Sequence, residues 1–298
     1  MNKAVGFCSF TLVGLVASVT HLSAAHAVQE LGNAGLTSTD LVNSLLGGSG
    51  INLLSGTVSY AGANIASGLF SGAGTTTGIP FSSGVLLTSG SVYRSIGPNT
   101  VGNNTQNNSL GGSSLLEAVT GLGGTQDASL LSFDFTSSLS SFSFQYAFGS
   151  EEYDEYVNTA FNDSFAFILQ DLTTGASAIN LAVIGASAVS INTVNNGSNP
   201  SYYQSNNGPA VYDLEYDGLA GGVGKNALYS VGNVVVGHTN RISLVIADRG
   251  DGDYDSGVFL KAGSFTAGTA QVPEAGTWGA AGLLGAAGFA GWLRRRKA

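Results

Sequence analysis

The stretch Ser141-Phe142-Ser143-Phe144-Gln145-Tyr146-Ala147-Phe148 decides the fold class. Its aromatic residues occupy every second position, and small or polar residues lie between them. Because successive side chains of a β-strand point to opposite faces, this alternation places the aromatic rings on one face of a sheet. We therefore expect a strand whose aromatic face lies in a hydrophobic core.

The same period of two recurs on both sides of this stretch. Phe133 and Phe135 precede it, and Phe165, Phe167 and Leu169 follow it. Three such strands, roughly ten residues apart, are typical of a sandwich or jelly roll. Further strands are expected at residues 83–88, 241–247 and 258–265. The sequence thus predicts a mainly β, single-domain body that resembles a β-sandwich or jelly roll.

Composition agrees with many short strands joined by turns. Of 298 residues, 44 are glycine and only 10% are charged, while 43% are hydrophobic, which disfavours disorder. Minor helices are expected at residues 38–46, after the polar Ser38-Thr39-Asp40, and at residues 113–119. Residues 189–208 are predicted to form a long Asn/Gly/Ser loop.

The first 27 residues have the pattern of a secretory signal peptide. Lys3 precedes an apolar run from Ala4 to Val19, and Ala25-His26-Ala27 offers a small-x-small cleavage site. Cleavage before Val28 would remove Cys8, the single cysteine, so no disulfide is expected in the mature protein. An uncleaved membrane anchor is the alternative interpretation.

The C-terminus predicts a membrane segment. An apolar stretch rich in glycine, alanine and leucine, expected to be a transmembrane helix over residues 276–293, precedes a basic tail at residues 294–297. Basic residues after an apolar segment stay on the cytoplasmic side of a membrane. Its many glycines offer a small-residue surface to a protein partner, so handling by a membrane enzyme is favoured over permanent anchoring.

This C-terminus resembles the PEP-CTERM sorting signal. The resemblance rests on a short motif, an apolar helix and an arginine cluster, and its residues are Val272, Pro273, Glu274, Arg294, Arg295 and Arg296. Ala275 replaces the second proline of the usual motif. The resemblance implies processing of residues 269–298 by an exosortase-like membrane enzyme, in a Gram-negative bacterium that makes exopolysaccharide. It places the protein at the cell surface, in the outer envelope or in the matrix.

The net charge of the body excludes some classes of binding partner. Residues 28–271 hold 18 carboxylates and five lysines or arginines, which gives this part a net charge of −13. Nucleic acids and anionic membrane surfaces are poor partners for such a field, whereas cations are good ones.

Carboxylates concentrate in two blocks, residues 149–156 with Asp163, and residues 248–257. Each block follows an apolar strand, so the two could meet at one edge of a sandwich. Clustered carboxylates repel one another unless a cation neutralises them, and Ca²⁺ prefers such oxygen ligands. The candidate ligands are Glu151, Glu152, Asp163, Asp248, Asp251, Asp253 and Asp255. A solvated acidic rim is the alternative.

Both blocks resemble the choice-of-anchor L domain. The matching segments are residues 148–165 and 246–260, within a resemblance that runs from about residue 35 to 267. It implies a secreted or surface-displayed module over residues 28–268, and it brings no catalytic residues.

The sequence is also compatible with two other functions. A carbohydrate-binding module could use Tyr202 and Tyr203, with Tyr153 and Tyr156, as stacking platforms for exopolysaccharide. A glycosidase would need a carboxylate pair such as Glu152 and Asp163. Because the body shows no nucleophile–base constellation, we expect a protein that is not an enzyme.

Overall fold

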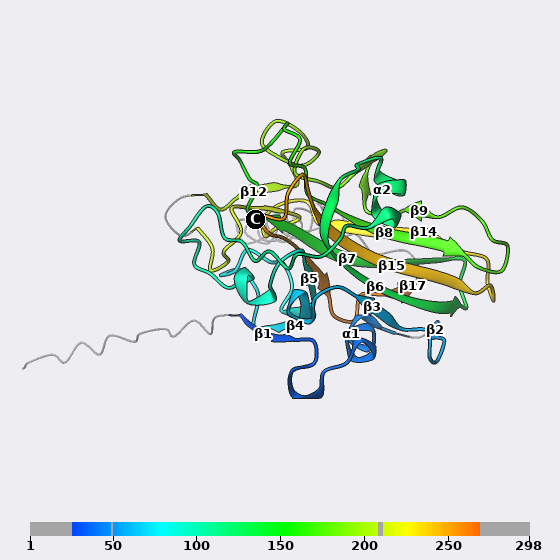
Figure 1. Ribbon diagram of the computed structural model, residues 1–298. Helices are drawn as coiled ribbons and strands as arrows, with labels where there is room; N and C mark the ends of the chain where they lie inside the picture. The colour runs from blue at the N-terminus through cyan, green and yellow to red at the C-terminus, as the bar shows by residue number, and fades with distance from the viewer. Residues whose placement is uncertain (1–25, 49, 208–210, 269–298) are drawn as a thin grey trace, which may run out of the picture.

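The computed structural model describes residues 26–48, 50–207 and 211–268. This part of the chain forms a nine-stranded sheet, a six-stranded sheet and a two-stranded sheet. Neither large sheet closes on itself, and the mainly β expectation is confirmed. Figure 1 shows the long strands running from hairpin turns at the right to a crowded set of loops at the left.

The nine-stranded sheet is built around β7 (Ser141–Ser150). The strands that complete its path are β1 (Ala27–Glu30), β4 (Ser67–Ser71), β5 (Ser83–Thr88), β16 (Ser256–Lys261), β13 (Gly218–Ala220) and β12 (Tyr203–Ser205). Two more strands, β14 (Leu228–Asn233) and β17 (Thr266–Ala267), pair with the first half of β7.

The six-stranded sheet is built around β15 (Asn240–Arg249), which pairs with β6 (Thr125–Ser137) and β8 (Ser164–Asp171). Its remaining strands are β2 (Ile51–Leu53), β3 (Ser59–Ala61) and β9 (Ile179–Asn180). The two-stranded sheet consists of β10 (Val183–Ile184) and β11 (Ser187–Ala188).

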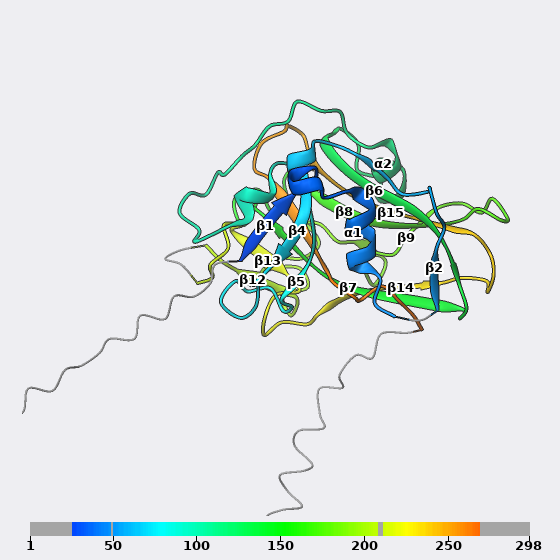
Figure 2. The same ribbon diagram turned by 90° about the horizontal axis from the view of Figure 1, so that it is seen from below.

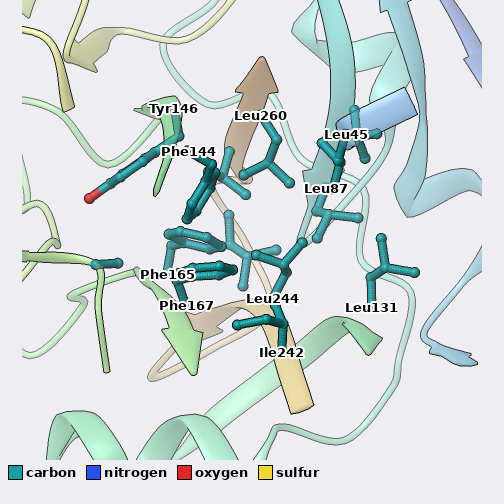
Figure 3. Close-up of a cluster of buried hydrophobic side chains, with 14 of the residues drawn as sticks. Leu45, Leu87, Leu131, Phe144, Tyr146, Phe165, Phe167, Ile242, Leu244 and Leu260 are labelled. Atoms are coloured by element: carbon teal, nitrogen blue, oxygen red, sulfur yellow. The ribbon is translucent and has the colours of Figure 1, made fainter. Parts of the chain in front are cut away.

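One hydrophobic core lies between the two large sheets. Phe144 of β7 meets Phe167 of β8, with 3.9 Å between ring centroids, and Phe142 meets Phe135 of β6 at 5.3 Å. Leu244 and other apolar residues of β15 complete the core, as Figure 3 shows. The aromatic face predicted for β7 is therefore the inner face of its sheet.

Short helices cover the outside of this core. Helix α1 (Ser38–Leu45) begins with a capping box, in which Thr37 and Asp40 satisfy each other's backbone N–H groups, and it buries Leu41, Val42 and Leu45. Helix α2 (Ser114–Thr120) is capped by Ser113 and packs Leu116 against the six-stranded sheet. The 3₁₀ turns are η1 (Asn33–Gly35), η2 (Asn64–Ala66) and η3 (Val92–Ser95).

Two expectations about individual segments are wrong. Residues 189–208 are not wholly a loop, because Tyr203–Ser205 pairs with β13 as strand β12; this long-range pairing overrides the polar local sequence. The strand expected at residues 258–265 ends at Lys261, since a turn with Gly263 at φ 64° follows.

Candidate functional site

The register of the nine-stranded sheet brings carboxylates from three strands into one row. Ser150, the last residue of β7, pairs with Ser256 at the start of β16 and with Gly218 at the start of β13. The residue just outside each of these positions is acidic. The row therefore consists of Asp217, Glu151 and Asp255.

The six-stranded sheet contributes its own acidic residues at the same end. Ala247 of β15 pairs with Ser164 of β8, so Asp248 and Asp163 lie next to each other beyond this pair. The backbone N–H of Glu151 donates to the carbonyl of Asp255 (3.1 Å), and Ser256 donates its hydroxyl to Asp163 (2.8 Å). The first contact lies within the row of the nine-stranded sheet, and the second joins this row to that of the six-stranded sheet.

We call this group of buried carboxylates the acidic edge. Its members are Asp127, Glu151, Glu152, Asp163, Glu215, Asp217, Asp248 and Asp255, each at most 4% exposed. Five of their oxygens are buried and accept no hydrogen bond: Glu151 Oε1, Glu152 Oε2, Asp217 Oδ2, and Oδ1 and Oδ2 of Asp248. Buried acceptors without partners are costly, so these oxygens call for a proton or a cation.

A polar segment at residues 99–110, which we call the strap, lies along the acidic edge. Its backbone N–H groups donate to carboxylates: Gln106 to both oxygens of Asp255 (3.0 Å each), and Asn108 to Asp127 (2.8 Å). The amide of Asn99 donates to Asp217 (2.5 Å). The asparagine-rich strap thus supplies neutral hydrogen-bond donors, which partly stabilise the negative charge but do not neutralise it.

Burial and mutual repulsion shift the protonation of these groups. Burial, with the charges of Asp217 and Glu215, raises the pKa of Glu151 to about 10. Burial, with the charge of Asp163, raises the pKa of Glu152 to about 9. Burial also raises the pKa of Asp217 and that of Asp255, each to about 6. Several members are therefore carboxylic acids at neutral pH unless a cation is present.

Asp163 and Asp248 form a tightly coupled pair. Both oxygens of Asp163 accept hydrogen bonds, from the N–H of Arg249 (2.9 Å) and the hydroxyl of Ser256 (2.8 Å). Burial and the neighbouring charge of Asp163 raise the pKa of Asp248 well above its usual value. Asp248 is thus the protonated partner. Since Asp163 is fully buried, with both oxygens in use, it is not placed to exchange protons with a substrate.

The cationic side chains near the acidic edge do not form ion pairs with it. Arg94 donates to the side chain of Asn104, and Arg249 donates to the carbonyls of Gly123 and Ala160. Among the described residues the ion pairs are those of His238 with Asp171 and of Arg241 with Asp134. Both lie at other positions in the fold.

The side chains of the acidic edge do not by themselves form a complete metal-binding site. Within residues 26–48, 50–207 and 211–268, no group of three or more His, Cys, Asp or Glu side chains has an arrangement that could hold a metal ion. A cation there would need additional ligands, from amide or backbone oxygens or from water.

The structure brings together five of the seven predicted ligands: Glu151, Glu152, Asp163, Asp248 and Asp255. Asp251 and Asp253 lie in the loop before β16, where Asp251 is half-buried and Asp253 is exposed.

Sequence reasoning missed Asp127, Glu215, Asp217 and the strap. A sequence pattern could have identified Glu215 and Asp217. Triplets of an acidic residue, a tyrosine and an acidic residue occur at residues 152–154, 215–217 and 253–255, and each triplet contributes to the acidic edge.

Tyr203 does not have the exposed ring that the predicted sugar-stacking platform requires. Tyr203 is 1% exposed, its ring packs on Tyr153 (4.8 Å between centroids), and its hydroxyl donates to Asp154 (2.7 Å). A stacking platform needs an exposed ring face, which Tyr203 lacks. Tyr202 is half-buried against the core, and Tyr156 packs against Phe161 and Tyr254.

The predicted sorting residues, Val272, Pro273, Glu274 and Arg294–Arg296, lie outside the described residues, as does most of the predicted signal peptide. In the described part of the chain, no helix combines the length and the hydropathy needed to span a bilayer.

Comparison with known proteins gives a family and no individual relative. No curated protein and no solved structure matches the chain. The profile of the Choice-of-anchor L domain matches residues 28–266, which is most of the chain and contains the whole acidic edge. This family is not a known catalytic one, and it indicates an exported, surface-associated protein. The chain belongs to the Choice-of-anchor L domain family.

Proposed function

We propose that this protein is a surface-displayed β-sandwich module whose acidic edge binds Ca²⁺, and that its C-terminus is a PEP-CTERM-type signal processed by an exosortase-like enzyme. The observation that carries the cation proposal is the acidic edge itself: it has eight buried carboxylates and five oxygens without partners, and neither of the two ion pairs among the described residues involves any of its members.

The chemistry of these donors fits a hard cation. Ca²⁺ takes six to eight oxygens, from carboxylates, amide and backbone carbonyls and water. The unpartnered oxygens of Glu151, Glu152 and Asp248 would provide the charge, and the asparagines of the strap offer amide oxygens. Binding would draw these groups closer together than they lie without the ion. The ion's role would be structural, since it would tie the strap to both sheets.

Calorimetric titration tests this proposal. At neutral pH, Ca²⁺ should bind with measurable heat and release protons, because raised-pKa carboxyl groups must ionise to become ligands. The double variant Glu151→Gln/Asp248→Asn should lose this binding, whereas Glu155→Gln, an exposed neighbour on the same loop, should retain it. Absence of heat with the natural protein, or equal binding by both variants, would reject the calcium site.

The sorting proposal rests on the C-terminal sequence. Replacing Arg294, Arg295 and Arg296 by serine removes the charges that fix the orientation of the apolar segment. In a Gram-negative host with an exosortase, this variant should accumulate as the uncut chain, and a Lys225→Ser control should be processed normally. Intact mass spectrometry of membrane and released fractions distinguishes the two. Normal release of the arginine-less variant would argue against the signal.

A further inference from the structure

The end of the sandwich opposite the acidic edge carries exposed apolar side chains, which we call the apolar tip. Its members and their exposed fractions are Leu139 (51%), Ile179 (51%), Val231 (43%), Val235 (55%) and Val236 (54%). Exposed apolar groups gathered on one surface are typical of interaction sites.

Backbone hydrogen bonds hold the two turns of this tip side by side. Leu139 lies in the turn between β6 and β7, and Val235 and Val236 lie in the turn between β14 and β15. The N–H of Val234 donates to the carbonyl of Ser140 (2.9 Å), and the N–H of Gly237 donates to that of Ser137 (3.2 Å). The tip is thus a fixed part of the fold.

A groove of about 390 Å³ continues the apolar tip towards β9. Leu169, Ile179, Val234 and Val235 are among the residues that line it. The carboxylate on its wall, Asp171, is paired with His238 at 2.8 Å. Among the described residues, the wall of this groove therefore has no cluster of unpaired carboxylates like that of the acidic edge.

The described chain leaves the fold beside the apolar tip. Strand β17 pairs with the first residues of β7, and the N–H of Gly268 donates to the carbonyl of Ser141 (2.7 Å). A methyl group on Gly268 would lie 3.8 Å from Leu139. Figure 2 shows this orange end of the described chain near β14.

The number of residues after Gly268 limits how far the predicted membrane segment can lie from the apolar tip. Only residues 269–274 separate Gly268 from Ala275, where the apolar stretch begins. The eight residue steps from Gly268 to residue 276 span at most about 28 Å. A bilayer that holds residues 276–293 would therefore lie within about 28 Å of the apolar tip, and the tether gives that contact a high effective concentration.

We propose, on the basis of the sorting function proposed above, that before processing the apolar tip lies on the bilayer that holds the C-terminal segment. The module then stands with its long strands away from the membrane. The 10 residues of β7 separate the two ends by about 30 Å, so the acidic edge faces outward, away from anionic headgroups. The Val272-Pro273-Glu274 motif is held at the membrane surface, where a membrane enzyme can reach it.

Single-cysteine labelling of the full chain tests this orientation. Cys8 is the sole cysteine, so a Cys8→Ser background carrying Val235→Cys accepts one fluorophore. Val101→Cys, in the strap, is the matched control, since Val101 is 47% exposed at the opposite end. Unchanged thermal melting shows that each labelled protein is folded.

The labelled chains are reconstituted into phosphatidylcholine vesicles that contain lipids with brominated acyl chains. The label at residue 235 should lose most of its fluorescence by contact quenching, and the label at residue 101 should lose little. Equal quenching at both sites, or none at residue 235, would overturn the proposal. Energy transfer between copies labelled at residue 235, without lipid quenching, would assign the tip to self-association instead. Because no readout involves Ca²⁺, the result is independent of the calcium site.

Discussion

In metal-free buffer, the protein is expected to lose stability as the pH rises from about 5 to about 8. A carboxyl group in an unfolded chain ionises near pH 4, but burial raises the pKa of Glu151 to about 10 and that of Glu152 to about 9. Between these values the folded protein binds more protons than the unfolded chain. The stabilisation is complete below the unfolded pKa, and it is lost as the pH rises towards the folded pKa.

The magnitude of this effect is measurable. Between its unfolded and folded pKa values, each of these groups lowers the stability by about 1.4 kcal/mol per pH unit, which lowers the Tm of a domain of this size by about 3–5 °C per pH unit. Thermal melts in the presence of a chelator give the value directly. Glu151→Gln should flatten the pH profile, because the amide imitates the protonated acid, and Glu155→Gln at the exposed position should leave it unchanged. Stability that rises over this pH range would show that the buried carboxylates are not protonated.

Gly90→Ala is expected to destabilise the protein by about 2–3 kcal/mol and to abolish its response to Ca²⁺. Gly90 lies two residues beyond the end of β5, and a Cβ there would overlap the carboxylate of Asp255. Asp255 cannot move freely, because both its oxygens accept from the N–H of Gln106. The added methyl group would therefore displace the carboxylate together with the strap. Urea unfolding with and without Ca²⁺ measures both effects.

Gly123→Ala is the matched control for this substitution. Gly123 also has an ordinary φ, and a Cβ there would meet nothing within 4 Å. Its midpoint of unfolding and its calcium response should equal those of the natural protein. A Gly90→Ala variant that behaves like this control would show that the contact between Gly90 and Asp255 is unimportant.

The sequence predicts the strands of this fold well where side chains alternate. The aromatic rings of β7 lie on the inner face, as their period of two requires, and β5, β8 and β15 fall within two residues of their expected positions. The strand around Phe133 is longer than expected, because the first half of β6 has a mixed sequence that pairing with β15 makes extended. Local pattern does not encode this pairing.

The candidate site is predictable only in part, for the same reason. Glu151 and Asp255 stand out in the sequence as members of acidic runs, and their residue types indicate the chemistry. Asp217 joins them because Gly218 pairs with Ser150, a register that no local pattern specifies. The strap is a polar loop in the sequence, and its role as a donor of N–H groups depends on its path across the sheet ends. Long-range pairing thus completes the site.

The most direct test of the acidic edge as a cation site is the Tm at about pH 7.5 in millimolar Ca²⁺, compared with the Tm in chelator. At a concentration of 100 times the Kd, binding to the folded state stabilises by about 2.7 kcal/mol, which raises the Tm by about 5–10 °C. The Glu151→Gln/Asp248→Asn variant should show no rise. An identical Tm for the natural protein in both buffers would contradict the account, because the buried carboxylates would then be satisfied by protons alone.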